Sequence, residues 1–206
     1  ETTFAPNAAM TRGMLVTALG RLAGIDVSGY TTSSFTDVKE GSTFQPYIEW
    51  AYGKGVIQSV GNGQFAPDRA VTREEIAVVL QNYARTTGYT LPVTRAVVTF
   101  ADNWSIGSAC KDAVKAMQQA GIMPGCTGNK FNPRSDATRA EVSAMLHRYI
   151  KLTIDPATAQ EWAKNDSGQR MYFKDGKALT GWQTVDGRIN GQLDVAVKHS
   201  RNFKLT

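Results

Sequence analysis

The chain has 206 residues, enough for one large domain or for a domain with a small appendage. Its hydrophobic share of 42% allows a sizeable core, and no apolar run approaches the roughly 20 residues that a membrane-spanning helix needs. The net charge of +5 is spread along the chain without a basic run, which argues against nucleic-acid binding and is compatible at most with an anionic partner.

A short string recurs three times along the chain. It consists of a phenylalanine, a proline two residues after it, and a Thr-Arg pair whose threonine lies seven residues after the phenylalanine. It occupies residues 4–12, 65–73 and 131–139, with the same spacing in each copy. A string that returns at such long intervals indicates one supersecondary unit used several times. The chain is therefore expected to contain three structural repeats.

Each Thr-Arg pair is predicted to start a helix. Counting from the arginine, apolar residues fall at positions +3, +6, +7 and +10 in every copy, which places one buried stripe on a helix of about three turns. Thr72 with Glu75, and Thr138 with Glu141, are predicted to form capping boxes, whereas Met14 leaves the first box half formed. Three equivalent stripes favour packing around a pseudo-threefold axis.

A shorter helix is predicted ahead of the string in the second and third copies, over residues 46–54 and 108–120. Gly55 and Gly121 stand just past the two expected ends, where a helix commonly stops. Each unit therefore consists of a lead helix, a turn, the Phe-x-Pro segment and a capped helix.

Capping does not explain why an arginine follows the threonine each time. Arg12, Arg73 and Arg139 would stand at the first helical position, where the helix dipole disfavours a cation by roughly 0.3–1 kcal/mol at an exposed site. One interpretation is an anion site, because the helix start offers free N–H groups and a guanidinium binds carboxylate or phosphate through two hydrogen bonds. The other is that each arginine pairs with an acid of the neighbouring repeat, such as Asp37 or Asp102. Both arrangements can coexist.

Little in the sequence suggests catalysis or metal binding. Cys110 and Cys126 lack metal-type spacing, and their separation leaves a disulfide and two free thiols equally open. His147 and His199 lie far apart in the sequence, and no Ser/His/Asp or Cys/His constellation is evident. No catalytic residue, metal site or cofactor is therefore predicted.

Several motifs in one order resemble the S-layer homology domain over roughly residues 4–150. They are Phe-x-Asp at residues 35–37 and 100–102, Gly-Val-Ile and Gly-Ile after the lead helices, and the Thr-Arg-x-Glu segments. The resemblance implies a mainly α fold, a pseudo-threefold helical domain of three repeats. The expected boundaries are residues 1–34, holding only the second half of repeat one, then 35–99 and 100–152.

The same resemblance implies non-covalent anchoring of a secreted protein to the bacterial cell wall, without membrane insertion. The expected partner is an anionic secondary polysaccharide linked to peptidoglycan, often one that ends in a pyruvylated amino sugar. The first repeat holds only a partial motif, so at least one groove between repeats is expected to be incomplete. By the family motif, ligand binding falls to Arg12, Arg73, Arg139 and Trp104. Asp37 and Asp102 remain the supporting acids that could orient these arginines toward a ligand.

Residues 153–206 are expected to form a linker and a small C-terminal β-hairpin. Residues 170–187 resemble a cell-wall-binding repeat of the choline-binding type, whose ligand sits between aromatic residues of successive repeats. Tyr172, Phe173 and Trp182 would form the apolar face of the hairpin. Because only one copy is visible, a hairpin that packs or links is favoured over a working choline site.

Two other functions remain open from the sequence. A wall-glycan hydrolase would need two carboxylates that flank a groove, but the acids here stand mostly at capping or repeat-start positions. A surface assembly scaffold without glycan binding is the third class. A binding module is preferred over both.

Overall fold

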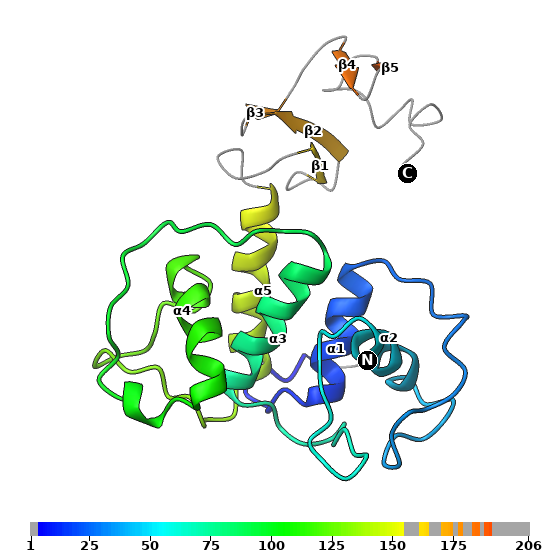
Figure 1. Ribbon diagram of the computed structural model, residues 1–206, viewed down its shortest axis with the longest axis vertical. Helices are drawn as coiled ribbons and strands as arrows, with labels where there is room; N and C mark the ends of the chain where they lie inside the picture. Colours follow the sequence, from blue (N-terminus) through cyan, green and yellow to red (C-terminus); the bar gives the residue numbers. More distant parts are fainter. Residues whose placement is uncertain are drawn as a thin grey trace. The chain divides into compact units, whose positions relative to one another are not determined.

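The computed structural model describes residues 4–154, 161–164, 170–174, 177–178, 183–185 and 188–190. The chain divides into two compact units, Glu1–Met145 and Leu146–Thr206. Helices predominate in the first unit, which confirms the predicted mainly α fold (Figure 1). They are α1 (Arg12–Leu22), α2 (Gln45–Gly53), α3 (Arg73–Thr86), α4 (Lys111–Gln119) and the start of α5 (Arg139–Ile154), with the 3-10 helices η1 (Asn103–Ser105) and η2 (Ser108–Cys110).

The helices α1, α3 and α5 begin at the predicted Thr-Arg pairs. In α3 the Glu75 N–H donates to the Thr72 hydroxyl at 3.4 Å, and the Thr72 N–H donates to the Glu75 carboxylate at 2.9 Å. Thr138 and Glu141 form the same reciprocal pair, so both predicted capping boxes are confirmed. In α1 the Thr11 hydroxyl accepts a hydrogen bond from the Met14 N–H, which is the predicted half box.

The apolar stripes of these helices form the core. All four stripe positions of α3 are buried, as are Leu15 and Leu19 of α1. Leu22 departs from the pattern with an exposed fraction of 42%, because α1 ends at this residue. The buried stripe of α1 is therefore one turn shorter than the sequence pattern predicts.

The lead helices also lie where the sequence predicts them. Helix α2 packs on α1, and α4, which continues from η2, packs on α3 (Figure 1). Gly55 and Gly121 follow their C-terminal ends with φ of 70° and 75°, a left-handed conformation that glycine adopts without strain.

Three backbone hydrogen bonds join the repeats in a closed ring. The Met10 N–H donates to the Ala137 carbonyl at 2.8 Å, the Ala137 N–H to the Val71 carbonyl at 3.1 Å, and the Val71 N–H to the Met10 carbonyl at 2.9 Å. All three residues are buried. Each repeat thus contacts the other two, as the predicted pseudo-threefold arrangement requires.

The described residues of the second unit include five short strands. The first three, β1 (Glu161–Lys164), β2 (Arg170–Lys174) and β3 (Lys177–Ala178), form one antiparallel sheet. A separate pair consists of β4 (Gln183–Val185) and β5 (Arg188–Asn190). Lys174 lies opposite Lys177, where the sequence predicts the hairpin.

The predicted aromatic face of the hairpin stays a prediction. Trp182 lies outside the described residues, and so do the side chains of Tyr172 and Phe173. Of the helices that are described, none combines the length and the apolar character that a membrane crossing requires.

Candidate functional site

Each Phe-x-Pro segment turns sharply, and in two repeats an aspartate holds the turn. Ala66 and Asn132 have φ of 58° and 55°, a left-handed conformation that costs a non-glycine residue about 1–3 kcal/mol. The Asp37 carboxylate accepts hydrogen bonds from the N–H groups of Phe65 at 2.8 Å and Ala66 at 2.7 Å. Asp102 makes the same two bonds in the third repeat. Both aspartates therefore support the loop backbone.

The N–H groups at the helix starts are already occupied. The Arg12 and Gly13 N–H groups of α1 donate to the carbonyls of Arg69 at 3.0 Å and Pro67 at 2.8 Å in the second repeat. The first two N–H groups of α3 and α5 donate in the same way to the next loop of the ring. Because the third N–H goes to the capping threonine, these donors are not left for an anion, which removes the helix-start N–H groups as support for the anion-site interpretation.

The guanidinium of Arg12 is buried against the second repeat. Its Nε–H donates to the Phe65 carbonyl at 2.8 Å, its Nη2 donates to the Gln58 carbonyl at 3.0 Å, and its Nη1 lies 3.4 Å from a Glu75 carboxylate oxygen. The guanidinium carbon also lies 4.6 Å from the centroid of the Phe65 ring, within cation–π range. Burial lowers the pKa of Arg12, and the negative charge of Glu75 opposes this shift.

Arg73 repeats this arrangement one step along the ring. Its Nε–H donates to the Phe131 carbonyl at 2.8 Å, and its Nη1 lies 3.6 Å from a Glu141 oxygen. The acid that pairs with Arg12 and with Arg73 is thus the capping glutamate of the next repeat, and not Asp37 or Asp102, the candidates that the sequence offered. The capping box places that carboxylate at the helix start, facing the preceding repeat, while the two aspartates bind the loops.

Arg139 differs from its two equivalents. Its Nη1 lies 3.6 Å from the sulfur of Met14, where the other arginines meet a glutamate. Its Nε is buried and finds no acceptor within the described part of the chain. Its guanidinium still lies over the Phe4 ring, 5.3 Å from the centroid. Met14 therefore stands where the other two junctions have a glutamate, and among its described contacts Arg139 has no carboxylate to balance its positive charge.

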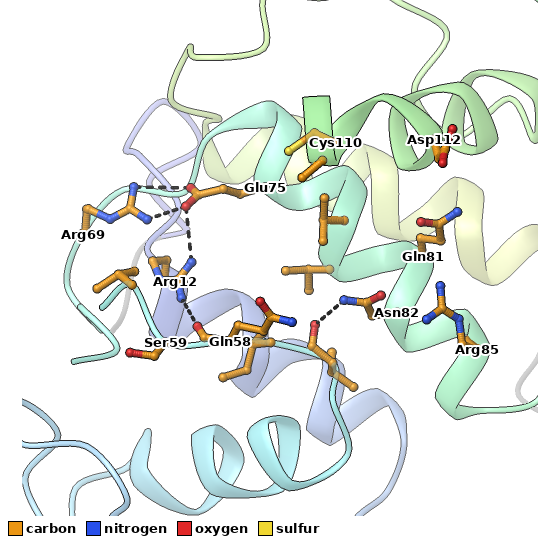
Figure 2. A pocket seen from close by; sticks show the side chains of 16 residues that line it. Arg12, Gln58, Ser59, Arg69, Glu75, Gln81, Asn82, Arg85, Cys110 and Asp112 are labelled. Carbon is orange, nitrogen blue, oxygen red and sulfur yellow. Dashed lines mark hydrogen bonds and ion pairs between the residues drawn. The ribbon is translucent and has the colours of Figure 1, made fainter. Parts of the chain in front are cut away.

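A groove of about 800 Å³ runs along α3 (Figure 2). Figure 2 shows Arg12, Arg69 and Glu75 together, with Arg85 further along the helix. Its walls combine apolar side chains, mainly valine and isoleucine, with many polar ones. The polar lining consists of Arg12, Gln58, Ser59, Arg69, Glu75, Gln81, Asn82, Arg85 and Asp112.

Arg69 is a second arginine on Glu75, and the sequence analysis did not identify it. Its Nη1 lies 3.3 Å from one oxygen of the Glu75 carboxylate, and its Nη2 contacts the other. The Arg69 side chain is 42% exposed, against 8% for Arg12. Ala8 and Ser135 stand at the corresponding positions of the other copies. This departure from the repeat was the signal that could have found Arg69.

Two further residues of interest lie near the chain segment that enters α4. Trp104 stands on η1 with 84% of its surface exposed, and it does not line the groove of Figure 2. Cys110 does line the groove, and it is a free thiol, as is Cys126. Of the two alternatives for these cysteines, the free thiols are therefore confirmed. Across the described residues, no group of potential metal ligands comes together.

Residues 34–77 and 105–143 match the family described as the S-layer homology domain. An amylopullulanase of Thermoanaerobacterium thermosulfurigenes is 34% identical over 73% of this chain. The S-layer protein sap of Bacillus anthracis is 26% identical over 93% of the chain, and a cellulosome-anchoring protein of Acetivibrio thermocellus is 22% identical over 88%. The chain covers 8%, 23% and 43% of the lengths of these three relatives, so each match concerns only part of a longer protein.

Proposed function

Because the chain carries S-layer homology sequence over residues 34–77 and 105–143, we propose that it anchors a larger protein to the bacterial cell wall. The ligand would be an anionic secondary polysaccharide linked to peptidoglycan, with a pyruvylated amino sugar as the leading candidate. The family match, together with the surface-layer and cellulosome-anchoring relatives, identifies a secreted protein associated with the cell wall.

The groove of Figure 2 is the observation that carries the proposal. Its lining includes three arginines and two acids, Glu75 and Asp112, which leaves a net charge of +1. Valine and isoleucine side chains on its walls offer apolar surface for the ring face of a sugar. Guanidinium groups suit the carboxylate of an acidic sugar, because they offer two parallel N–H donors to two oxygens.

The proposed residue roles are those that the family motif and the neighbouring acids suggest. We propose that Arg12, Arg73 and Arg139 supply the positive charge at their three repeat junctions. The exposed indole of Trp104 would stack on a sugar ring, since an aromatic face with high exposure offers apolar contact area outside the core. Asp37 and Asp102 would act indirectly, by holding the loops that precede the helices.

We propose a binding module and not a hydrolase. A glycosidase needs one carboxylic acid that stays protonated, with a raised pKa. Burial alone would raise the pKa of Glu75, but hydrogen bonds from Arg69 and from the Thr72 N–H outweigh burial and leave it lowered. Glu75 is therefore ionised and already engaged, which suits an ion pair better than acid catalysis.

The C-terminal strands are a secondary part of the proposal. Residues 170–187 would extend the wall-facing part of the protein or link it to a neighbouring domain. The antiparallel pairing of β2 with β3 supports a hairpin at this place.

Co-sedimentation with purified sacculi tests the proposed function. The protein is expected to pellet with sacculi that retain their secondary polymer and to stay in solution after the polymer has been chemically removed. Peptidoglycan stripped of the polymer is the matched control. Equal pelleting with stripped and unstripped sacculi would contradict the proposal.

A further inference from the structure

Arg12, the most buried arginine of the groove, has little capacity left for a ligand. Each of its three guanidinium nitrogens already donates to the protein, to the Phe65 carbonyl, the Gln58 carbonyl or Glu75. The Phe65 ring covers one face of the group. Arg12 therefore contributes fixed positive charge to the groove, while its contacts hold two repeats together.

Arg69 stands on the solvent side of the same carboxylate. Within the described residues, its guanidinium contacts Glu75 and, at 3.4 Å, the carbonyl of the adjoining Ala70. Figure 2 shows Arg69 and Arg12 reaching Glu75 from different segments of the chain. The two guanidinium ends of Arg69 each contact one oxygen of Glu75, so a sugar carboxylate that took the place of Glu75 would make the same kind of two-point contact.

Glu75 keeps other partners if Arg69 is taken from it. Its carboxylate accepts hydrogen bonds from the Thr72 N–H and hydroxyl, and it pairs with Arg12. By contrast, the described partners of Glu141 include one arginine, Arg73. At the junction between the first and second repeats, the single carboxylate of Glu75 faces two guanidinium groups, which leaves a surplus positive charge. At the next junction, Glu141 balances the single charge of Arg73.

We propose that Arg69 is the residue that recognises the carboxylate of an acidic sugar in this groove, and that Glu75 is an internal carboxylate which the ligand displaces from it. This inference rests on the proposed function and deepens it. Because Ala8 and Ser135 replace Arg69 in the other copies, the recognition belongs to this groove alone. The other junctions would lack this contact.

The test compares variants by calorimetric titration with two probes: an N-acetylhexosamine carrying a pyruvate ketal, and the same sugar without the ketal. Arg69→Ala is expected to weaken binding of the acidic sugar by about 10-fold or more, because a charge-assisted contact is lost. Binding of the neutral sugar is expected to stay unchanged. Arg134→Ala, which removes an exposed arginine from the corresponding loop of the third repeat, is the matched control and is expected to bind as the wild type does.

Glu75→Gln tests the displacement. Glutamine can serve in a capping box, so the helix start is retained while the competing charge is removed. The acidic sugar is expected to bind several-fold more tightly to this variant. Weaker binding would show that Glu75 assists the ligand and would overturn this half of the inference.

The two proposals fail in different ways. If the wild type pellets with polymer-bearing sacculi but Arg69→Ala binds the acidic sugar as well as Arg134→Ala does, the inference is wrong and the anchoring function stands. If the wild type does not pellet, the anchoring function fails and the inference with it. Should Arg69→Ala not fold, Arg69→Lys replaces it: lysine keeps the charge but lacks the paired donors, so a loss of affinity is expected and wild-type affinity would refute the role.

Discussion

Arg12 holds Phe65 in two ways, because its Nε–H donates to the Phe65 carbonyl at 2.8 Å while its guanidinium covers the Phe65 ring at 4.6 Å. Phe65 is fully buried, so its carbonyl would otherwise face the protein interior. Arg73 makes both contacts with Phe131. Arg12 and Arg73 thus hold successive repeats together, independently of any role in ligand binding.

Arg73→Ala is expected to lower the free energy of unfolding by about 1–3 kcal/mol, because the buried Phe131 carbonyl loses its donor. Urea denaturation followed by circular dichroism measures the loss. Arg134→Ala removes the same charge from an exposed position and is expected to stay within about 0.5 kcal/mol of the wild type. Equal stability of the two variants would mean that the Arg73 contacts do not matter for folding.

Met14→Glu is expected to stabilise the domain by about 0.5–1 kcal/mol. The new glutamate would complete the capping box of α1 and would give Arg139 the carboxylate that Arg12 and Arg73 already have. Met14→Gln completes the box without the charge, so the difference in melting temperature between the two variants isolates the ion pair. A melting temperature below the wild type for both would refute the expectation.

Stability is expected to depend on Asp102 in a pH-dependent way. Burial raises the pKa of Asp102, but the hydrogen bonds from the Phe131 and Asn132 N–H groups outweigh burial and lower it overall. A carboxyl whose pKa is lowered by folding stabilises the folded state above its ordinary pKa of about 3.9, and this contribution is lost as the pH falls. Melting temperatures measured from neutral to acid pH should therefore converge for wild type and Asp102→Asn below about pH 4. Parallel curves would contradict this role.

Gly20→Ala and Gly53→Ala are expected to act in opposite directions. A Cβ at Gly20 would lie 2.5 Å from a ring carbon of Tyr47, which forces α1 away from α2 and costs about 1–3 kcal/mol. A Cβ at Gly53 meets nothing within 4 Å, so the gain in helix propensity should stabilise by about 0.4–1 kcal/mol. Thermal unfolding of both variants checks the opposite signs.

Trp104→Ala is expected to leave the unfolding free energy within about 0.5 kcal/mol, since the side chain is almost wholly exposed. Pelleting with polymer-bearing sacculi should nevertheless weaken, because the stacking surface for a sugar ring is lost. Trp50→Phe is a useful comparison, because Trp50 is buried in the core. This variant should lose stability while its pelleting with sacculi stays unchanged. Unchanged pelleting of Trp104→Ala would remove this residue from the site.

The helix starts and the core faces could be predicted from the sequence because both depend on local patterns. Thr72 and Glu75 are three residues apart, and the spacing of the apolar stripe follows the turn of a single helix. The same logic located the lead helices and their glycine stops. These features need no knowledge of how the repeats meet.

The partners of the arginines could not be predicted, because they lie in another repeat. The capping role alone accounts for Glu75 in the sequence, so its second contact with Arg12, 63 residues away, leaves no sign there. Asp37 is one of the partners that the sequence offers, but it binds the backbone of a strained loop whose left-handed turn no local rule predicts. Arg69 stands where the other two copies have Ala8 and Ser135, so its only sign in the sequence is this departure from the repeat.

The ring of hydrogen bonds among Met10, Val71 and Ala137 sets this domain apart from an open solenoid. In a solenoid each repeat touches only its sequence neighbours, so a terminal repeat can be removed while the others persist. Here the first and last repeats touch each other, and no repeat is terminal. Removing any one repeat opens two of the three junctions at once, so the domain should be lost as a whole and should not shorten gradually.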